Sequence, residues 1–450
     1  MATNYDLIVK GGTAATPNGI APADIAVRDG KVAAIGDLGG ASAAEVFDAR
    51  GLHVLPGVID SQVHFREPGL EHKEDLATGT AGAVLGGVTA VFEMPNTKPN
   101  TLTEADLADK LARAAGRAWC DVAFFIGAAE SNAAELGELE RLPGCAGVKV
   151  FMGSSTGNLL VDDDDTLRAV LRSGRRRVAV HAEDENRLRE RHALVRDGTD
   201  VARHPEWRDV ETATAATRRL MRLAREAGRR VHVLHVTTAE ETEILAAHKD
   251  IATFEVTPQH LTLVAPDCYA ELGTLAQMNP PIREARHREG LWRAVGQGLA
   301  DCIGSDHAPH TREEKARPYP QSPSGMPGVQ TLLPLMLDHV NAGRLSLERL
   351  VDLTSAGPAR IYNVAGKGRL AVGYDADLTI VDLKAQRTIT NAWMATKSGW
   401  TPFDGRRVTG WPKATILRGR IVMREDELIG APSGIPVRFA ECLPPEAGIA

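Results

Sequence analysis

Short apolar runs alternate with helical patterns along the middle of the chain. The spacing of charged and apolar positions predicts helices such as Glu104–Ala115, with Thr103 as N-cap, and Glu211–Ala227, which ends at Gly228. Strands and helices that alternate over about 300 residues predict an α/β fold, a (β/α)8 TIM-like barrel. Eight runs are predicted as its strands: Val54–Ile59, Val88–Phe92, Val122–Ile126, Gly147–Phe151, Val178–Val180, Val231–Leu234, Ile251–Val256 and Cys302–Ile303.

Both ends of the chain have a β pattern instead. An Asp29-Gly30 pair between alternating runs predicts one hairpin near the start, and Gly419 is the centre of a second near the end. Each end is too short for a core of its own. We therefore expect a small composite β-sandwich domain formed by both termini, from residues 1–55 and 366–450, with a barrel domain over residues 56–365.

Composition and charge narrow the classes of function. The chain has 450 residues and a net charge of −7, and only 4% of its residues are aromatic. The negative charge and the few aromatic residues disfavour a nucleic-acid partner, because proteins that bind nucleic acid have a basic surface and aromatic side chains that stack on bases. The longest uncharged run contains four glycines and is not a membrane span. Five cysteines without a C-x-x-C motif argue against disulfides and against a thiolate zinc site, so we expect a cytoplasmic protein.

Residues able to bind a metal follow several of the predicted strands. His64, His181, His235 and Asp306 each come at or just after an apolar run, where the catalytic groups of a parallel barrel lie. Each alone is more typical of a structural hydrogen bond, but together they suit Zn²⁺ or a similar divalent ion. Lys149 lies inside an apolar run; there its amine would be neutral and able to add CO₂, although a snorkelling or ion-paired lysine is the alternative.

His232 receives the opposite interpretation. In a strand, the side chain of His232 points to the opposite side from that of Val233, so we expect a structural role for His232.

Several motifs together resemble the amidohydrolase superfamily and, within it, the dihydroorotases. The resemblance covers nearly the whole chain. The two motifs that begin at His64 and Met94 are closer to dihydroorotases than to allantoinases or hydantoinases. The motifs are His64-Phe65-Arg66-Glu67-Pro68-Gly69 with Met94-Pro95-Asn96-Thr97, then Lys149 in its strand, His181-Ala182-Glu183, His235-Val236, Met278-Asn279-Pro280, Ser305-Asp306-His307-Ala308-Pro309-His310 and Gly373-Tyr374-Asp375-Ala376-Asp377.

The resemblance implies an activity and a set of roles. The activity is the reversible hydrolysis of the cyclic amide of dihydroorotate to N-carbamoyl-L-aspartate, in pyrimidine synthesis. Two zinc ions would be bridged by a carbamate on Lys149, one completed by His181 and His235 and the other by His64 and Asp306. Asp306 would also carry the proton. Arg66, Asn96 and His310 would hold the substrate's carboxylate, and Asn279 would contact its ring. We expect a homo-oligomer, such as a dimer, and an association with aspartate transcarbamoylase is consistent with the resemblance.

Gln62 is the main departure, because the family usually has a histidine there. An amide oxygen is a weaker ligand than imidazole, so the site on this side is weaker, differently coordinated or partly empty. Gln259 also stands where many dihydroorotases have a histidine, and the loop at residues 323–328 is similar to hydantoinases as well. Two other functions therefore stay open: a hydantoinase or allantoinase, and an inactive subunit that scaffolds aspartate transcarbamoylase.

Overall fold

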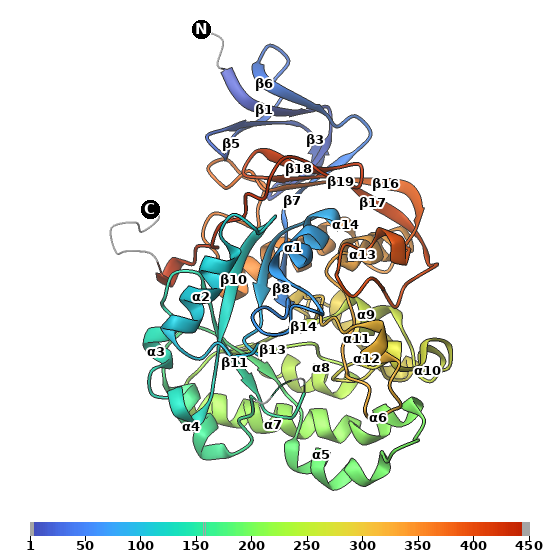
Figure 1. The fold of residues 1–450 in the computed structure, drawn as a ribbon. Helices are drawn as coiled ribbons and strands as arrows, with labels where there is room; N and C mark the ends of the chain where they lie inside the picture. Colours follow the sequence, from blue (N-terminus) through green and yellow to red (C-terminus); the bar gives the residue numbers. More distant parts are fainter. Residues whose placement is uncertain (1–3, 156, 158, 443–450) are drawn as a thin grey trace.

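The fold was analysed in a computed structural model, which describes residues 4–155, 157 and 159–442. Within them, eight parallel strands follow one another in chain order around a barrel (Figure 1). The ring closes where Val63 forms a parallel bridge with His307, and the amide of His64 donates to the carbonyl of His307 at 2.7 Å. The strands are β8 (Val58–Val63), β9 (Val88–Glu93), β10 (Asp121–Gly127), β11 (Cys145–Phe151), β12 (Val178–His181), β13 (Val231–Val233), β14 (Ala252–Val256) and β15 (Cys302–Ile303).

The barrel predicted from the apolar runs is confirmed. Seven of its strands lie within a few residues of the expected bounds. The first is different: the run Val54–Ile59 is divided between β7 (His53–Pro56), which belongs to another sheet, and the start of β8. The division falls at Gly57, whose amide donates to the carbonyl of Asp377 as the chain passes from one sheet to the other.

Helices cover the outside of the barrel. α2 begins with the expected capping box, in which Thr103 and Asp106 each accept from the other's backbone amide, and α7 ends at Gly228 in a left-handed conformation (φ 64°). The longer helices are α1 (Leu76–Leu85), α2 (Glu104–Ala114), α4 (Asp164–Arg172), α5 (Glu185–Arg191), α7 (Val210–Ala227), α8 (Ala239–Ala246), α11 (Ala285–Gly296) and α13 (Leu332–Asn341). The shorter ones are α3 (Leu136–Leu139), α6 (His204–Trp207), α9 (Pro258–Thr262), α10 (Asp267–Leu272), α12 (Arg312–Lys315), α14 (Leu347–Val351) and α15 (Gly357–Tyr362).

Two sheets beside the barrel combine both ends of the chain. The larger has the order β19-β18-β17-β16-β7-β2-β3, and its centre is the antiparallel pair of β16 with β7. The smaller has the order β5-β4-β1-β6, and residues of both sheets share one apolar core. Both expected hairpins are present, as β4–β5 and β17–β18. The remaining bounds are β1 (Asn4–Lys10), β2 (Thr13–Thr16), β3 (Gly19–Pro22), β4 (Asp24–Arg28), β5 (Lys31–Gly36), β6 (Ser42–Asp48), β16 (Leu378–Thr388), β17 (Arg407–Leu417), β18 (Arg420–Arg424) and β19 (Glu427–Leu428).

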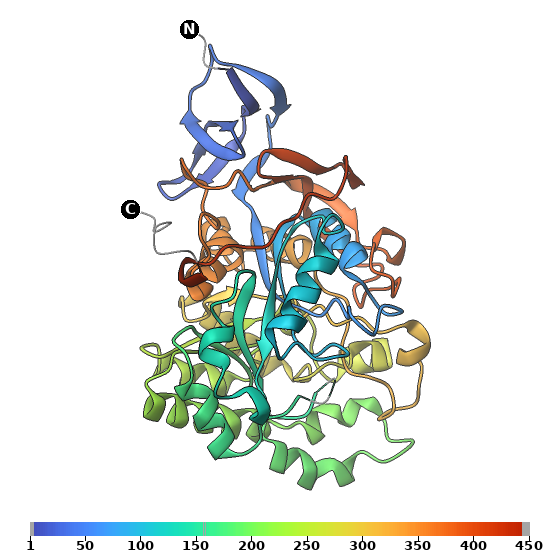
Figure 2. The ribbon, with the colours of Figure 1, turned by 60° about the vertical axis from the view of Figure 1, so that its left-hand side comes forward.

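The segment after β19 runs back along the barrel (Figure 2), and Val437 donates its amide to the carbonyl of Val122 in β10. The mixed sheet agrees with the composite sandwich expected from the sequence. The domain bounds, 1–55 with 366–450 and 56–365, stay predictions, and residues 1–3 and 443–450 lie outside the described part. Among the described helices, none is long and apolar enough to cross a membrane.

A buried ion cluster joins the sandwich to the barrel. Lys367 lies 2.6 Å from Asp121 of β10 and 3.2 Å from Asp375, and it also pairs with Asp377 just before β16. All four side chains are at most 6% exposed. Asp121 also pairs with Arg418 and Asp375 with Lys31, but Asp377 has no other ion-pair partner among the described residues and depends on Lys367 for compensation in a medium of low polarity.

Replacing Lys367 by methionine should destabilise the protein strongly, because it leaves the buried carboxylate of Asp377 without its cation and removes one partner each from Asp121 and Asp375. We expect a loss of about 3–5 kcal/mol in the free energy of unfolding, measured by urea titration. The control is Lys413→Met, which removes the partner of a solvent-facing Glu425 and should cost less than about 1 kcal/mol. Equal losses in the two variants would show that the cluster does not join the two parts.

Candidate active site

The carboxyl ends of the barrel strands surround one cavity. Its lining includes every residue predicted for the site except His310, although these residues are up to about 240 positions apart in the chain. Those lining it are Gln62, His64, Arg66, Asn96, Lys149, His181, His235, Asn279 and Asp306, with Phe151, Ser155, Ala308, Ser324 and Gly325. Parallel strands all end at the same rim of the barrel, which brings these side chains together.

Lys149 points into the barrel from β11. Its neighbours Val148 and Val150 pack outward against the helices, as strand alternation requires. The side chain is 1% exposed, and burial lowers the pKa of its amine to about 7. Its Nζ lies 4.4 Å from the centre of the Phe151 ring. A substantial fraction of such an amine is neutral near neutrality, which is the form that reacts with CO₂.

His181 and His235 face each other across the cavity. Nδ1 of His181 lies 3.1 Å from Nε2 of His235. On its other side, His181 donates from Nε2 to Glu183 at 2.9 Å, and Glu183 is itself paired with Arg208. This carboxylate holds the imidazole so that Nδ1 presents its lone pair to the cavity. His235, which lies two residues after the end of β13, has a positive φ of 37°.

His64 and Gln62 meet Asp306 on the opposite side. Nε2 of His64 lies 3.3 Å from Oδ1 of Asp306, and the amide of Gln62 donates to the same oxygen at 3.1 Å. Nδ1 of His64 donates to the amide oxygen of Asn96 at 2.8 Å, so Asn96 orients an imidazole in addition to lining the cavity. Burial raises the pKa of Asp306 to about 6.

A cationic group occupies one end of the cavity. Arg66 donates from Nε to the carbonyl of Pro309 at 3.1 Å, and its Nη2 lies 3.3 Å from Nε2 of His310. Its Nη1 is buried and has no hydrogen-bond partner among the described residues. Lys73 donates to Nδ1 of His310 at 3.0 Å and pairs with Glu314 at 3.1 Å. Arg66 thus keeps one nitrogen available for a ligand.

His310 lies behind Arg66, and Asn279 lies at another side of the cavity. The position of His310 suits holding the guanidinium in place. The side-chain oxygen of Asn279 accepts from Nε2 of His204 at 3.0 Å, which leaves its amide group for other partners.

The donor set fits divalent metal ions of the zinc class. Three imidazoles and carboxylate oxygens, without a thiol, meet around the cavity. Two buried atoms next to them, Oε1 of Gln62 and Nδ1 of His235, have no hydrogen-bond partner among the described residues. Oε1 of Gln62 is therefore available as a ligand. The weaker coordination expected at this position stays a prediction.

Sequence reasoning assigned no role to two charged residues that support the site, Glu183 and Lys73. The sequence contained a signal for Glu183. It lies two positions after His181, and side chains two positions apart in an extended segment point to the same side. Lys73 had no such signal, since its contact with His310 spans 237 residues.

Comparison with known proteins places the chain in a family. The model of the amidohydrolase family matches residues 53–422. A dihydroorotase of Halobacterium salinarum is 39% identical over 83% of this chain and 87% of its own, and one of Methanosarcina mazei is 35% identical over 92% and 93%. An allantoinase of Escherichia coli is 34% identical over 93% and 95%. Among solved structures, an L-hydantoinase from Arthrobacter aurescens has a TM-score of 0.91 at 32% identity, covering 96% of this chain and 99% of its own.

The chain therefore belongs to the amidohydrolase family, and it is a hydrolase. The resemblance to dihydroorotases found in the motifs is confirmed by these relatives.

Replacing Glu183 by glutamine should weaken metal binding at the cavity. The neutral amide no longer polarises the imidazole of His181, and loss of such outer-shell partners costs about 10- to 100-fold in metal affinity. Competition with a chromogenic chelator measures the change. Glu190→Gln, an exposed position of helix α5, is the control and should leave the affinity unaltered. An unchanged affinity in Glu183→Gln would contradict an orienting role.

Proposed function

We propose that the protein is a metal-dependent dihydroorotase, which interconverts dihydroorotate and N-carbamoyl-L-aspartate in pyrimidine synthesis. Relatives named dihydroorotase support this assignment. The observation that carries it is Arg66, a cation that is 1% exposed, lines the cavity and has an unpartnered Nη1. Burial of a guanidinium is costly unless an anion compensates it, and the carboxylate of dihydroorotate is such an anion.

Two zinc ions are proposed to be held by the residues around the cavity. His181 and His235 would bind one, and His64, Asp306 and the amide oxygen of Gln62 the other. Lys149, as a carbamate, would bridge the two. Bound there, the ions supply Lewis acidity and lower the pKa of a water molecule.

The chain's own residues bind the substrate and move the proton. Arg66 binds the carboxylate and Asn279 contacts the ring, so that the scissile amide faces Asp306. Water adds to the ring carbonyl carbon, its proton passes to Asp306, and the bond from carbon to nitrogen breaks as Asp306 protonates the leaving nitrogen. Ring closure follows the same steps in reverse and releases water. The raised pKa of Asp306, about 6, suits a group that both accepts and donates a proton.

A hydantoinase or allantoinase is the second candidate, favoured by the allantoinase relative and by the hydantoinase structures. Their substrates lack the ring carboxylate, so Arg66 discriminates between the two proposals. The hypothesis of an inactive scaffold for aspartate transcarbamoylase is supported by Gln62 alone. Such a scaffold would bind no metal at the cavity. A dimeric state and a complex with aspartate transcarbamoylase stay predictions.

Replacing Arg66 by glutamine should reduce kcat/KM for dihydroorotate by about 10- to 150-fold, as expected for loss of a charge-assisted hydrogen bond of about 1.5–3 kcal/mol. The assay follows ultraviolet absorbance, and metal content should stay unchanged. Arg225→Gln on helix α7 is the control, because this arginine pairs with solvent-facing Asp250. A wild-type enzyme that turns over hydantoin or allantoin in preference to dihydroorotate would overturn the assignment.

Replacing Lys149 by alanine should remove metal and activity together, because the bridging carbamate cannot form. Elemental analysis by mass spectrometry measures the metal, and a short carboxylic acid should restore part of both. Lys249→Ala, at an ion pair with Asp301 between the segments that precede β14 and β15, is the control. A variant that keeps the wild-type metal content would contradict the carbamate ligand.

A further inference from the structure

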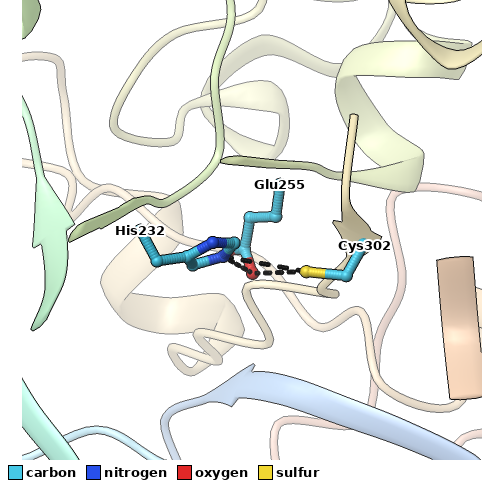
Figure 3. Close-up of side chains that lie close together, drawn as sticks. All are labelled: His232, Glu255 and Cys302. Carbon is cyan, nitrogen blue, oxygen red and sulfur yellow. Dashed lines mark hydrogen bonds and ion pairs between the residues drawn. The ribbon is translucent and has the colours of Figure 1, made fainter. Parts of the chain in front are cut away.

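Three side chains with metal-binding atoms meet inside the barrel, outside the lining of the cavity. They are His232 of β13, Glu255 of β14 and Cys302 of β15, and all three are fully buried (Figure 3). Nε2 of His232 lies 3.5 Å from Oε2 of Glu255 and 3.7 Å from Sγ of Cys302. Sγ of Cys302 lies 3.9 Å from the same oxygen of Glu255. The three atoms thus form a compact triangle.

Strand alternation and register explain the meeting. Val231 and Val233 pack outward against the helices, so His232 between them points into the barrel. On the next pair of strands, Glu255 is directly opposite Cys302. The cluster therefore comes from three adjacent strands, which no spacing motif in the sequence could reveal.

The size of the triangle fits one metal ion. Zinc lies about 2.0 Å from oxygen or nitrogen and about 2.3 Å from sulfur, so the edges of a tetrahedral site are about 3.3–3.6 Å long. The observed edges exceed these by a few tenths of an ångström, which a small inward movement of the side chains would close. A fourth possible ligand atom is next to the triangle, since Oγ of Ser61 lies 3.4 Å from Oε2 of Glu255 and 3.9 Å from Sγ of Cys302.

The surroundings orient these groups as ligands. Nδ1 of His232 lies 2.8 Å from Oγ1 of Thr253, and donation to that hydroxyl leaves the lone pair of Nε2 directed at the triangle. Oε1 of Glu255 accepts from the amide of His235 at 3.3 Å, which leaves Oε2 facing the other two atoms.

The cluster also lacks a compensating cation. Within the described part of the chain, Glu255 forms no ion pair with a lysine or an arginine; its ion-pair partner is His232. The ring of Tyr362 packs edge-on against His232, and its buried hydroxyl finds no hydrogen-bond partner among the described residues. A carboxylate and a thiolate together with one divalent ion would be neutral, which is the favourable state in a medium of low polarity.

We propose that His232, Glu255 and Cys302 form a buried site for a divalent ion of the zinc class, distinct from the cavity. The ion would be structural. It would join β13, β14 and β15 directly beneath the segments that carry His235 and Asp306. Binding releases the proton of the thiol, and that of the carboxyl where it is protonated, to solvent. Because the site is closed, the ion would enter while the chain folds. The site departs from the expectation drawn from cysteine spacing, since it uses one cysteine only.

Cobalt substitution tests the site without relying on activity. The full-length protein is produced in medium with Co²⁺ in place of Zn²⁺, and its near-ultraviolet spectrum is recorded. No thiol lines the cavity, so a sulfur-to-cobalt charge-transfer band reports on Cys302. We expect the band in the wild type. Cys302→Ser should lose both the band and one equivalent of metal. Cys268→Ser, at a buried free cysteine elsewhere, is the matched control and should keep the band.

Two further variants separate the possible outcomes. His232→Gln should weaken or shift the band, because one nitrogen ligand is replaced. Lys149→Ala should keep it, which distinguishes failure of this site from failure of the proposed function. Absence of the band from the folded wild type, or its persistence in Cys302→Ser, would overturn the proposal and leave a hydrogen-bonded cluster. The wild-type spectrum decides even if a variant does not fold.

Discussion

Closure of the parallel barrel is the constraint on which the rest of the structure depends. β8 and the segment after β15 are joined by the hydrogen bond from His64 to His307, which completes the ring. Only a closed ring brings the end of the first strand beside the end of the last. Gln62 and His64 thereby reach Asp306, a contact that spans more than 240 residues. The cavity and the contacts around it follow from this geometry.

Charged side chains are buried at three places in the protein, which differ in how far the charge is compensated. Lys367 compensates several carboxylates at the junction with the sandwich. Glu183 pairs with Arg208 and holds His181. Around the cavity, by contrast, Lys149 and Arg66 lack a full set of partners, and burial lowers the pKa of both. Groups that lack compensation in the folded chain are the ones suited to a bound ligand.

Polar side chains lie in two layers inside the barrel, together with apolar residues such as Phe92 and Phe125. The upper layer lines the cavity and contains imidazoles, carboxylates and Lys149. The lower layer contains His232, Glu255 and Cys302, with Tyr362 beside it. The two are linked through the backbone of His235, which donates to Glu255. Rigid support from the lower layer would fix the strand ends on which the upper layer is built.

The sequence by itself determined most of the barrel strands, helices α2 and α7 and the residues at the strand ends, but not the division of the run Val54–Ile59 between two sheets. Alternation and capping depend on neighbours a few positions apart, so the runs around Lys149 and the box at Thr103 could be recognised directly. The tertiary structure decided which side chains meet. It placed His310 behind Arg66, joined Asn96 to His64, and brought Glu255 to Cys302. These contacts depend on strand register and ring closure, which couple residues that are distant in the chain, and no local pattern encodes them.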